Sequence, residues 1–293
     1  MKWTYPDVHS YYDHTRFDYR RIWNRRRRDV AVHFGYYDEH AHRHEDALDN
    51  MNRVLAGYAG IQAGEHVLDA GCGVGNACFW LAQHLQARVT GVNIVASQIA
   101  DCRQQAVLKN LPEASFVEAD FCNMPFENDT FNVVWACESI CHAPEKAAFY
   151  REAFRVLKPG GRLVMAEYMR QNRPVSTKGE QLLADWLRPW AIPDIDTADE
   201  HRHYAKEAGF EEVVIRDATT NVRVSLRNLH DLSAAWLPFG RVFRFFHIVN
   251  DIRLDNVKAS MRQYEALREE AWMYGILTAG KKSFPQISAE KFR

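Results

Sequence analysis

The chain has 293 residues, of which 47% are hydrophobic, and a formal net charge of −1 at pH 7. This length suits one α/β domain with additions or two small domains. The near-neutral charge argues against a general attraction to nucleic acid, and no apolar run of about 18 residues indicates a membrane span. The six cysteines form no CxxC pair and the N-terminus shows no signal-peptide pattern, so we expect a cytoplasmic protein.

Residues 1–57 are rich in aromatic side chains, which suggests a helical cap that closes over a pocket. A simpler interpretation is that most of these rings only pack the segment against the rest of the protein. Tyr11, Tyr12 and the stretch 33–37, which includes Tyr36, are our candidates for contact with a ligand. Because such a cap can equally pack on a partner chain, a homo-oligomer is left open.

Arginines cluster in the same segment, at Arg20, Arg21 and the run 25–28. On a helix, neighbours in such a run lie about 100° apart and cannot share one face. The plain interpretation is a solvated basic surface. The functional alternative is an anion site in which Arg25 and Arg28 bind a diphosphate through their forked donors. A nucleic-acid arm is disfavoured, because the run is short and the rest of the chain is not basic.

Three alternating histidines follow, at His40, His42 and His44. They would share one face of a strand, where a metal site is conceivable, but would spread apart on a helix. No cysteine or acidic cluster completes a ligand set, so we predict no resident metal. A magnesium ion between acidic residues and a diphosphate is left open.

The segment 67–76 (VLDAGCGVGN) holds the strongest motif of the chain. An apolar run ends in Asp69, and glycines follow at alternate positions from Gly71, which predicts a buried strand, a tight turn and a helix start. The dinucleotide fingerprint has its acid about 20 positions later, and the Gly-Lys-Ser/Thr ending of a phosphate loop is absent. An acid ahead of the turn repels phosphate but can bind an ammonium group. The simplest alternative is a turn without a ligand.

Further strands alternate with helical patterns, which favours a parallel, doubly wound sheet with ligands beyond the carboxyl ends of its strands. A turn is expected at 158–161 before the fifth strand, and a helix at 198–208 ends at a glycine. After the first strand, the others are predicted at 88–94, 114–119, 130–136, 162–168, 213–216 and 272–279.

The segment 221–270 is an insertion between the last two strands, where aromatic and aliphatic residues alternate with arginines. We expect a helical lid at about 222–270 that gives the pocket an apolar wall, although core packing explains about half of these residues. The predicted domains are a cap at 1–57, a core at 58–170, and the rest of the core with the lid at 171–293.

The D-x-G-x-G-x-G motif resembles the first motif of class I S-adenosylmethionine-dependent methyltransferases. The resemblance implies a Rossmann-like fold with a mostly parallel sheet of seven strands, in which Asp69 faces the methionine part of the cofactor. It also implies that Asn93 binds the ribose hydroxyls, and that Asp120 and Phe121 contact the adenine. The predicted cofactor contacts are Asp69, Ala70, Gly71, Cys72, Gly73, Asn93, Ile94, Gln98, Asp120, Phe121 and Glu138.

The segment 136–144 (ACESICHAP) is similar to the E-x-x-x-H-A-P stretch of sterol C-24 methyltransferases, a group that includes tocopherol and bacterial terpene methyltransferases. The runs 154–161 and 274–279 fit the same group. The sterol-contact stretch of the true sterol enzymes is poorly matched at 18–24, which argues against a sterol. The resemblance therefore implies C-methylation of an isoprenoid chain, either a prenyl diphosphate or a terpenoid derivative.

Methyl transfer to an alkene carbon leaves a carbocation, which needs aligned reactants, aromatic faces and a base. We predict that Glu138 opposes the positive charge and that His142 or a tyrosine, with Tyr12 as candidate, takes the proton. The alternative for His142 is a helix-end residue bonded to backbone. Predicted substrate contacts are Tyr11, Tyr36, Trp186, Trp236, Phe246, Arg25 and Arg28.

Two other functions are considered. The first is N- or O-methylation of a small aromatic natural product, which would also use an apolar pocket and one base. The second is a cofactor-binding regulatory protein without turnover, which the intact motif residues Asp69, Gly71, Gly73 and Asp120 disfavour.

Overall fold

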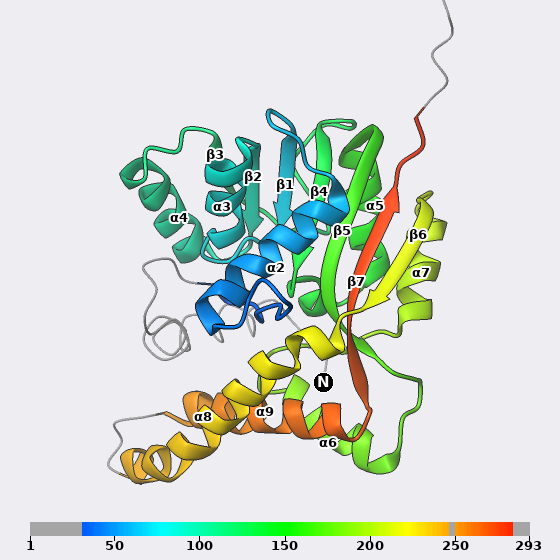
Figure 1. Cartoon of the computed structure of the whole chain (residues 1–293). Helices are drawn as coiled ribbons and strands as arrows, with labels where there is room; N and C mark the ends of the chain where they lie inside the picture. Colours follow the sequence, from blue (N-terminus) through cyan, green and yellow to red (C-terminus); the bar gives the residue numbers. More distant parts are fainter. Residues whose placement is uncertain (1–30, 246–249, 284–293) are drawn as a thin grey trace, which may run out of the picture.

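The structure is a computed structural model that describes residues 31–245 and 250–283 (Figure 1). Its centre is a seven-stranded sheet in the order β3-β2-β1-β4-β5-β7-β6. Six strands run in one direction, and β7 runs in the opposite direction between β5 and β6. This confirms the predicted Rossmann-like, doubly wound and mostly parallel fold. The strands are β1 (His66–Ala70), β2 (Arg88–Asn93), β3 (Ala114–Glu118), β4 (Phe131–Cys137), β5 (Leu157–Arg170), β6 (Glu211–Asp217) and β7 (Trp272–Gly280).

Helices cover both faces of the sheet, because the central strands are apolar on both sides. Along β1, Val67 belongs to one hydrophobic cluster and Leu68 to the other. Such double-sided burial is typical of parallel strands. The helices α2 (His44–Ala59), α3 (Asn76–Leu85) and α4 (Ala96–Leu108) contribute to the first cluster. The second cluster includes side chains of α5 (Lys146–Val156) and α7 (Ala198–Glu207).

Three more helices lie beyond the end of the sheet where the parallel strands finish (Figure 1). They are α6 (Thr177–Leu187), α8 (Thr219–Phe245) and α9 (Asp251–Arg268). Since α8 follows β6 and α9 leads into β7, the predicted insertion between the last two strands is helical. Its role as a lid stays a prediction.

The structure differs from the sequence-based expectation at the start of the fifth strand, and the predicted domain borders stay a prediction. The predicted turn at 158–161 is part of β5, which begins at Leu157 and pairs irregularly with β4 near Phe131. The helix α2 runs across the predicted domain border at residue 57.

Several predicted features can be located only in part. Tyr11, Tyr12, Arg25, Arg28 and Phe246 lie outside the described residues. Within 31–245 and 250–283, no group of His, Cys, Asp or Glu residues could hold a metal ion. In the same ranges, no helix is both long and apolar enough to cross a membrane.

Candidate functional site

The turn after β1 is built from glycines because its backbone is left-handed. Gly71, Gly73 and Gly75 have φ angles of 86°, 52° and 81°. The N–H groups of Gly71 and Cys72 both donate to the carbonyl of Val92 at 2.9 Å, which fastens the turn to β2. A Cβ atom on Gly71 would lie 2.4 Å from the Cβ of Ser139. Only glycine fits this position, where a ligand can approach bare backbone.

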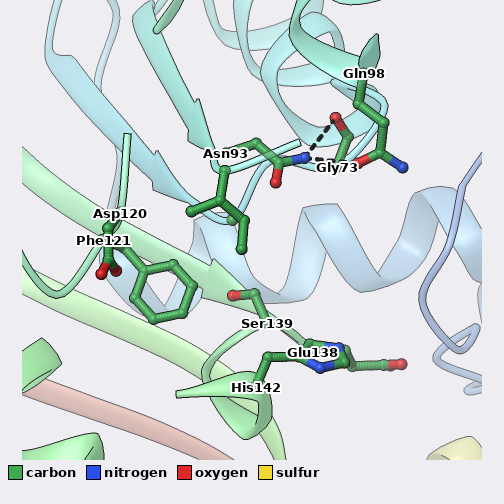
Figure 2. Close-up of a pocket in the computed structure, with 10 residues that line it drawn as sticks. Gly73, Asn93, Gln98, Asp120, Phe121, Glu138, Ser139 and His142 are labelled. Atoms are coloured by element: carbon green, nitrogen blue, oxygen red, sulfur yellow. Dashed lines mark hydrogen bonds between the residues drawn. The ribbon is translucent and has the colours of Figure 1, made fainter. Parts of the chain in front are cut away.

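A pocket opens at the carboxyl ends of the strands, next to this turn (Figure 2). In Figure 2, Asn93 and Gln98 lie on one side, Asp120 and Phe121 on another, and Ser139, Glu138 and His142 are in the lower part of the view. All of its lining residues except Ser139 were predicted from the sequence. They are Gly71, Gly73, Asn93, Ile94, Gln98, Asp120, Phe121, Glu138, Ser139 and His142.

Hydrogen bonds fix the polar wall of this pocket. The Asn93 amide donates to Gln98 Oε1 at 2.6 Å and to the Gly73 carbonyl at 3.4 Å, so it joins β2, α4 and the glycine turn. On the other side, Asp120 Oδ1 accepts the N–H of Cys122 at 2.8 Å. These bonds hold amide and carboxylate groups in place before any ligand arrives, which lowers the cost of binding.

Three predicted cofactor residues lie behind the turn. Asp69 is 3% exposed, and its carboxylate accepts a hydrogen bond from the Cys78 thiol at 3.1 Å. Burial raises the pKa of Asp69 to about 7. Ala70 and Cys72 are also buried, and the Ala70 carbonyl accepts the Ser139 hydroxyl at 2.6 Å. A thiol is a weak donor, so the Asp69 charge has little compensation inside the protein.

Glu138 is held in the pocket by three hydrogen bonds. Its Oε1 accepts the N–H of Phe34 at 2.8 Å and the hydroxyl of Tyr274 at 2.7 Å, while Oε2 accepts the hydroxyl of Tyr168. Burial raises its pKa to about 7. The residue has φ 51°, an uncommon conformation for a non-glycine residue that often marks functional sites.

His142 ends the short helix η2 (Ile140–His142), which follows β4. Its Nδ1 lies 3.0 Å from the carbonyl oxygen of Ala191. Because a carbonyl can only accept, Nδ1 carries the proton and Nε2 the lone pair. Burial lowers the pKa of His142 to about 4, so the ring is neutral at pH 7. His142 therefore both forms a hydrogen bond to the backbone and lines the pocket, and each had been predicted as an alternative.

Tyr168 and Tyr274 are site residues that the sequence did not indicate. They are directly opposite each other in the antiparallel pair of β5 and β7. The pairing of these strands is a long-range feature, so the convergence of both hydroxyls on Glu138 could not be predicted from local patterns. A tyrosine within each of two apolar strands was the only available signal.

Three predicted substrate contacts do not line the described pocket. Trp186 is fully buried against Tyr168 and Trp272, so it belongs to the core. Trp236 lies over Gly240 of its own helix, where an added Cβ would meet its ring. Tyr36 is half-buried beside α2, and its backbone N–H donates to Ala47. Core and helix packing account for these positions, and contact of Trp186, Trp236 and Tyr36 with a substrate stays a prediction.

Comparison with known proteins agrees with this geometry. Residues 68–165 match the family model of a methyltransferase domain. The 27-O-demethylrifamycin SV methyltransferase of Amycolatopsis mediterranei is 30% identical over 85% of this chain and 89% of its own length. The sterol 24-C-methyltransferase of Saccharomyces cerevisiae is 34% identical over 73% of this chain but only 55% of its own length.

A solved structure shows the same fold. The geranyl diphosphate C-methyltransferase of Streptomyces coelicolor A3(2), in complex with Mg²⁺, geranyl diphosphate and S-adenosyl-L-homocysteine, is 20% identical. It aligns over 90% of this chain and 97% of its own, with a TM-score of 0.64. At this identity the likeness concerns the fold alone.

The fold and the glycine turn define a cofactor-dependent transferase of the Rossmann-like class. The chain belongs to the class I S-adenosylmethionine-dependent methyltransferases. It is therefore an enzyme, and S-adenosylmethionine is its cofactor. The residues present fit this group, because a glycine cradle that any Cβ would fill lies beside a buried carboxylate.

We expect Gly71→Ala to weaken S-adenosylmethionine binding and to destabilise the fold by roughly 1–3 kcal/mol. The reason is the contact of an added Cβ with Ser139 together with the left-handed φ. Calorimetric titration and thermal unfolding measure both effects. The control is Gly57→Ala in α2, where nothing lies within 4 Å of an added Cβ. This control should stabilise the chain by up to about 1 kcal/mol. Unchanged binding in Gly71→Ala would contradict the role of the turn.

Proposed function

We propose that the protein is a C-methyltransferase that acts on an alkene carbon of an isoprenoid or terpenoid substrate. The observation that carries this proposal is that one pocket is lined both by a carboxylate that accepts three hydrogen bonds and by a neutral, weakly basic imidazole. Glu138 accepts three donors and His142 has a pKa of about 4. A general base for a phenol, alcohol or ammonium substrate works best with a pKa near the operating pH. Glu138 has such a pKa, about 7, but its oxygens already accept three hydrogen bonds from the protein.

The base requirement of alkene methylation is different. When the π electrons of an alkene form the new bond to the methyl group, the adjacent carbon becomes a cation, and its neighbouring C–H bond is strongly acidic. A weak base such as the Nε2 atom of His142 suffices to take that proton. In this proposal, Glu138 stabilises the cation electrostatically, because its carboxylate is held in place and needs no reorganisation.

The cofactor-binding roles form part of the proposal. Bound S-adenosylmethionine supplies an electrophilic methyl group. We propose that the backbone of Gly71 and Gly73 binds next to it, that Asn93 and Gln98 contact its ribose hydroxyls, and that Asp120 binds its adenine amino group. The ring of Phe121 would cover the adenine ring. It packs edge to face on Phe149, with 5.8 Å between the ring centroids.

The substrate class is supported by a relative and by the sequence. The sterol 24-C-methyltransferase to which this chain is 34% identical acts on a sterol carbon, as its name states. The E-x-x-x-H-A-P stretch with Glu138 and His142 belongs to the same resemblance. A diphosphate would find its partners in the segment of Arg25 and Arg28, which lies outside the described residues.

O-Methylation of a natural product is the second candidate. It is favoured by the relative from Amycolatopsis mediterranei, whose name states a demethylrifamycin substrate and which this chain covers almost completely. In that case Glu138 or His142 would have to remove a proton from a hydroxyl group.

The experiment that separates the candidates is incubation with methyl-labelled S-adenosylmethionine and a substrate panel. The panel holds isopentenyl, geranyl and farnesyl diphosphates, a sterol with a side-chain double bond, an indole and a phenol. We expect label in an isoprenoid product. Label only in the indole or the phenol would contradict the proposal while leaving the enzyme class intact.

A further inference from the structure

The ring of His142 is held by a backbone carbonyl from a distant segment. The acceptor, Ala191, belongs to the loop between α6 and α7 and has φ 55°. This left-handed conformation is unfavourable for a non-glycine residue, and it persists only where the surroundings enforce it. Something must therefore hold the loop 188–197 against the segment that carries His142.

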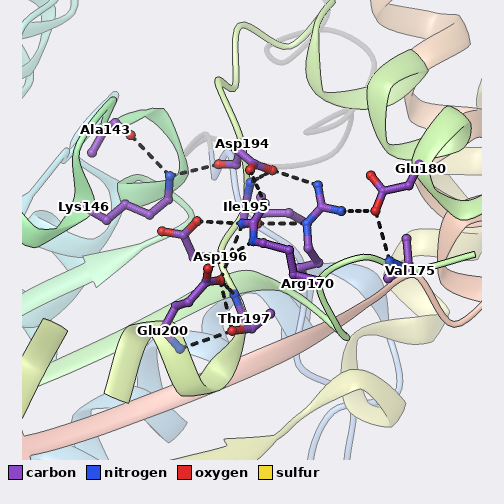
Figure 3. Close-up of polar contacts among 11 residues, drawn as sticks. Ala143, Lys146, Arg170, Val175, Glu180, Asp194, Ile195, Asp196, Thr197 and Glu200 are labelled. Carbon is purple, nitrogen blue, oxygen red and sulfur yellow. Dashed lines mark hydrogen bonds and ion pairs between the residues drawn. The ribbon is translucent and has the colours of Figure 1, made fainter. Parts of the chain in front are cut away.

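Lys146 joins these two segments directly (Figure 3). It is only 5% exposed at the start of α5. Its Nζ donates to the carbonyl of Ala143 at 3.2 Å and to the carbonyl of Asp194 at 2.9 Å. Ala143 is the residue after His142, and Asp194 lies three positions after Ala191. One buried ammonium group thus fastens both partners of the imidazole–carbonyl pair.

The Asp194 end of this connection is anchored further. Its carboxylate accepts from Arg170 at 2.9 Å and from Arg173 at 2.8 Å, and Arg170 also donates to Glu180 at 2.7 Å (Figure 3). Arg170 is the last residue of β5, so the loop is tied to the central sheet. Arg170 is the buried member of this network, whereas Asp194, Arg173 and Glu180 are partly exposed, and together their hydrogen bonds tie the loop to the end of β5.

The η2 end is anchored to the same strand. Glu167 of β5 is fully buried, and its Oε2 accepts the N–H of Cys141 at 2.9 Å. Its Oε1 accepts the N–H of Tyr168 at 2.8 Å. The chain on both sides of the His142 ring is therefore fixed relative to β5, and Lys146 is the group that spans the two sides.

We infer that Lys146 is a positioning residue for the reaction, which acts by holding the Ala191 carbonyl on His142 Nδ1 and so keeps the lone pair on Nε2. This inference rests on the proposed function in one respect, the use of His142 as proton acceptor. The inference assigns a role to Lys146, a residue to which no local sequence motif pointed. A lysine at this place that served only stability would leave the tautomer of His142 unchanged when replaced.

The test combines the state of the ring with catalysis, in the full-length enzyme. Nitrogen-15 NMR of histidine-labelled protein distinguishes the two tautomers, and the signal of His142 among the 13 histidines is assigned by its loss in His142→Gln. In Lys146→Met we expect the second tautomer to become populated. We also expect kcat to fall, by up to roughly 10²-fold, while KM for S-adenosylmethionine stays within about twofold. In Lys146→Arg, we expect both the Nδ1–H tautomer of His142 and most of the wild-type kcat to be retained.

Lys178→Met is the matched control, because it removes an exposed lysine that pairs with Glu269 at 2.7 Å. It should change neither the tautomer nor kcat. If Lys146→Met does not fold, Lys146→Gln replaces it as the test variant. Its shorter side chain keeps a donor but cannot reach both carbonyls, so we again expect the second tautomer and a lower kcat. An unchanged Nδ1–H tautomer in the folded variants would overturn the inference. If His142→Gln turns over at the wild-type rate, the base assignment fails instead, whatever the NMR shows.

Discussion

Asp69→Asn is expected to weaken S-adenosylmethionine binding by roughly 10- to 100-fold. The substitution keeps the shape of the side chain but removes a buried charge, and hydrogen bonds to charged groups contribute about 1.5–3 kcal/mol. Asp69 is 3% exposed and is the last but one residue of β1, just before the glycine turn. Isothermal titration of the cofactor measures the change directly. Asp129→Asn is the matched control, since it removes a partner of Lys281 next to the opposite end of β4.

The same variant should be more stable than the wild type without cofactor, and the difference should grow with pH. Burial raises the pKa of Asp69 to about 7 in the folded chain, from an ordinary value of 3.8. Folding therefore takes up a proton between these values, and the contribution of Asp69 to the free energy of unfolding falls as pH rises. Unfolding of both proteins at about pH 5 and about pH 8 tests the sign. If Asp69→Asn bound S-adenosylmethionine as tightly as the wild type, the assignment of Asp69 to the cofactor site would be contradicted.

Glu138→Gln is expected to lower kcat by roughly 10²–10³-fold, the size typical of a lost electrostatic contact to a transition state. Cofactor binding should change far less. The fold can accept the amide, because its oxygen still receives the N–H of Phe34 and the hydroxyl of Tyr274, and its nitrogen can donate to Tyr168. What is lost is the negative charge that opposes the developing cation.

Single-turnover rates and calorimetric titration separate the two quantities. Glu65→Gln serves as the control, since Glu65 pairs with Arg162 near the amino end of β1, away from the pocket. It should lower stability but not kcat. An equal loss of turnover and of cofactor affinity in Glu138→Gln would show that the residue holds the cofactor rather than the cation.

Much of the pocket lining could be predicted because its residues lie in local motifs at strand ends. Gly71, Asn93 and Asp120 each follow or end a strand of recognisable length, and parallel strands bring those ends together. The sequence of elements then predicts the sheet and the position of the pocket. Such features depend on contacts between neighbours in sequence and on one general rule of topology.

The rest of the site depends on contacts that no local pattern contains. Tyr274 reaches Glu138 across a sequence separation of 136 residues, through the antiparallel pairing of β7. Lys146 reads from sequence as an ordinary lysine at a helix start, yet its ammonium is buried between two carbonyls. Trp186 shows the opposite case, since a large aromatic residue near a predicted pocket fills the core instead.

The central claim is that the methyl group is transferred to carbon. The most direct measurement is the carbon-13 NMR spectrum of the product formed from S-adenosylmethionine labelled in its methyl group, with the best substrate of the panel. Correlation of the labelled methyl protons with neighbouring carbons of an isoprenoid chain is the predicted result. A labelled methyl group bonded to oxygen or nitrogen would contradict it, and would leave His142 and Glu138 to be explained as a base and its partner in heteroatom methylation.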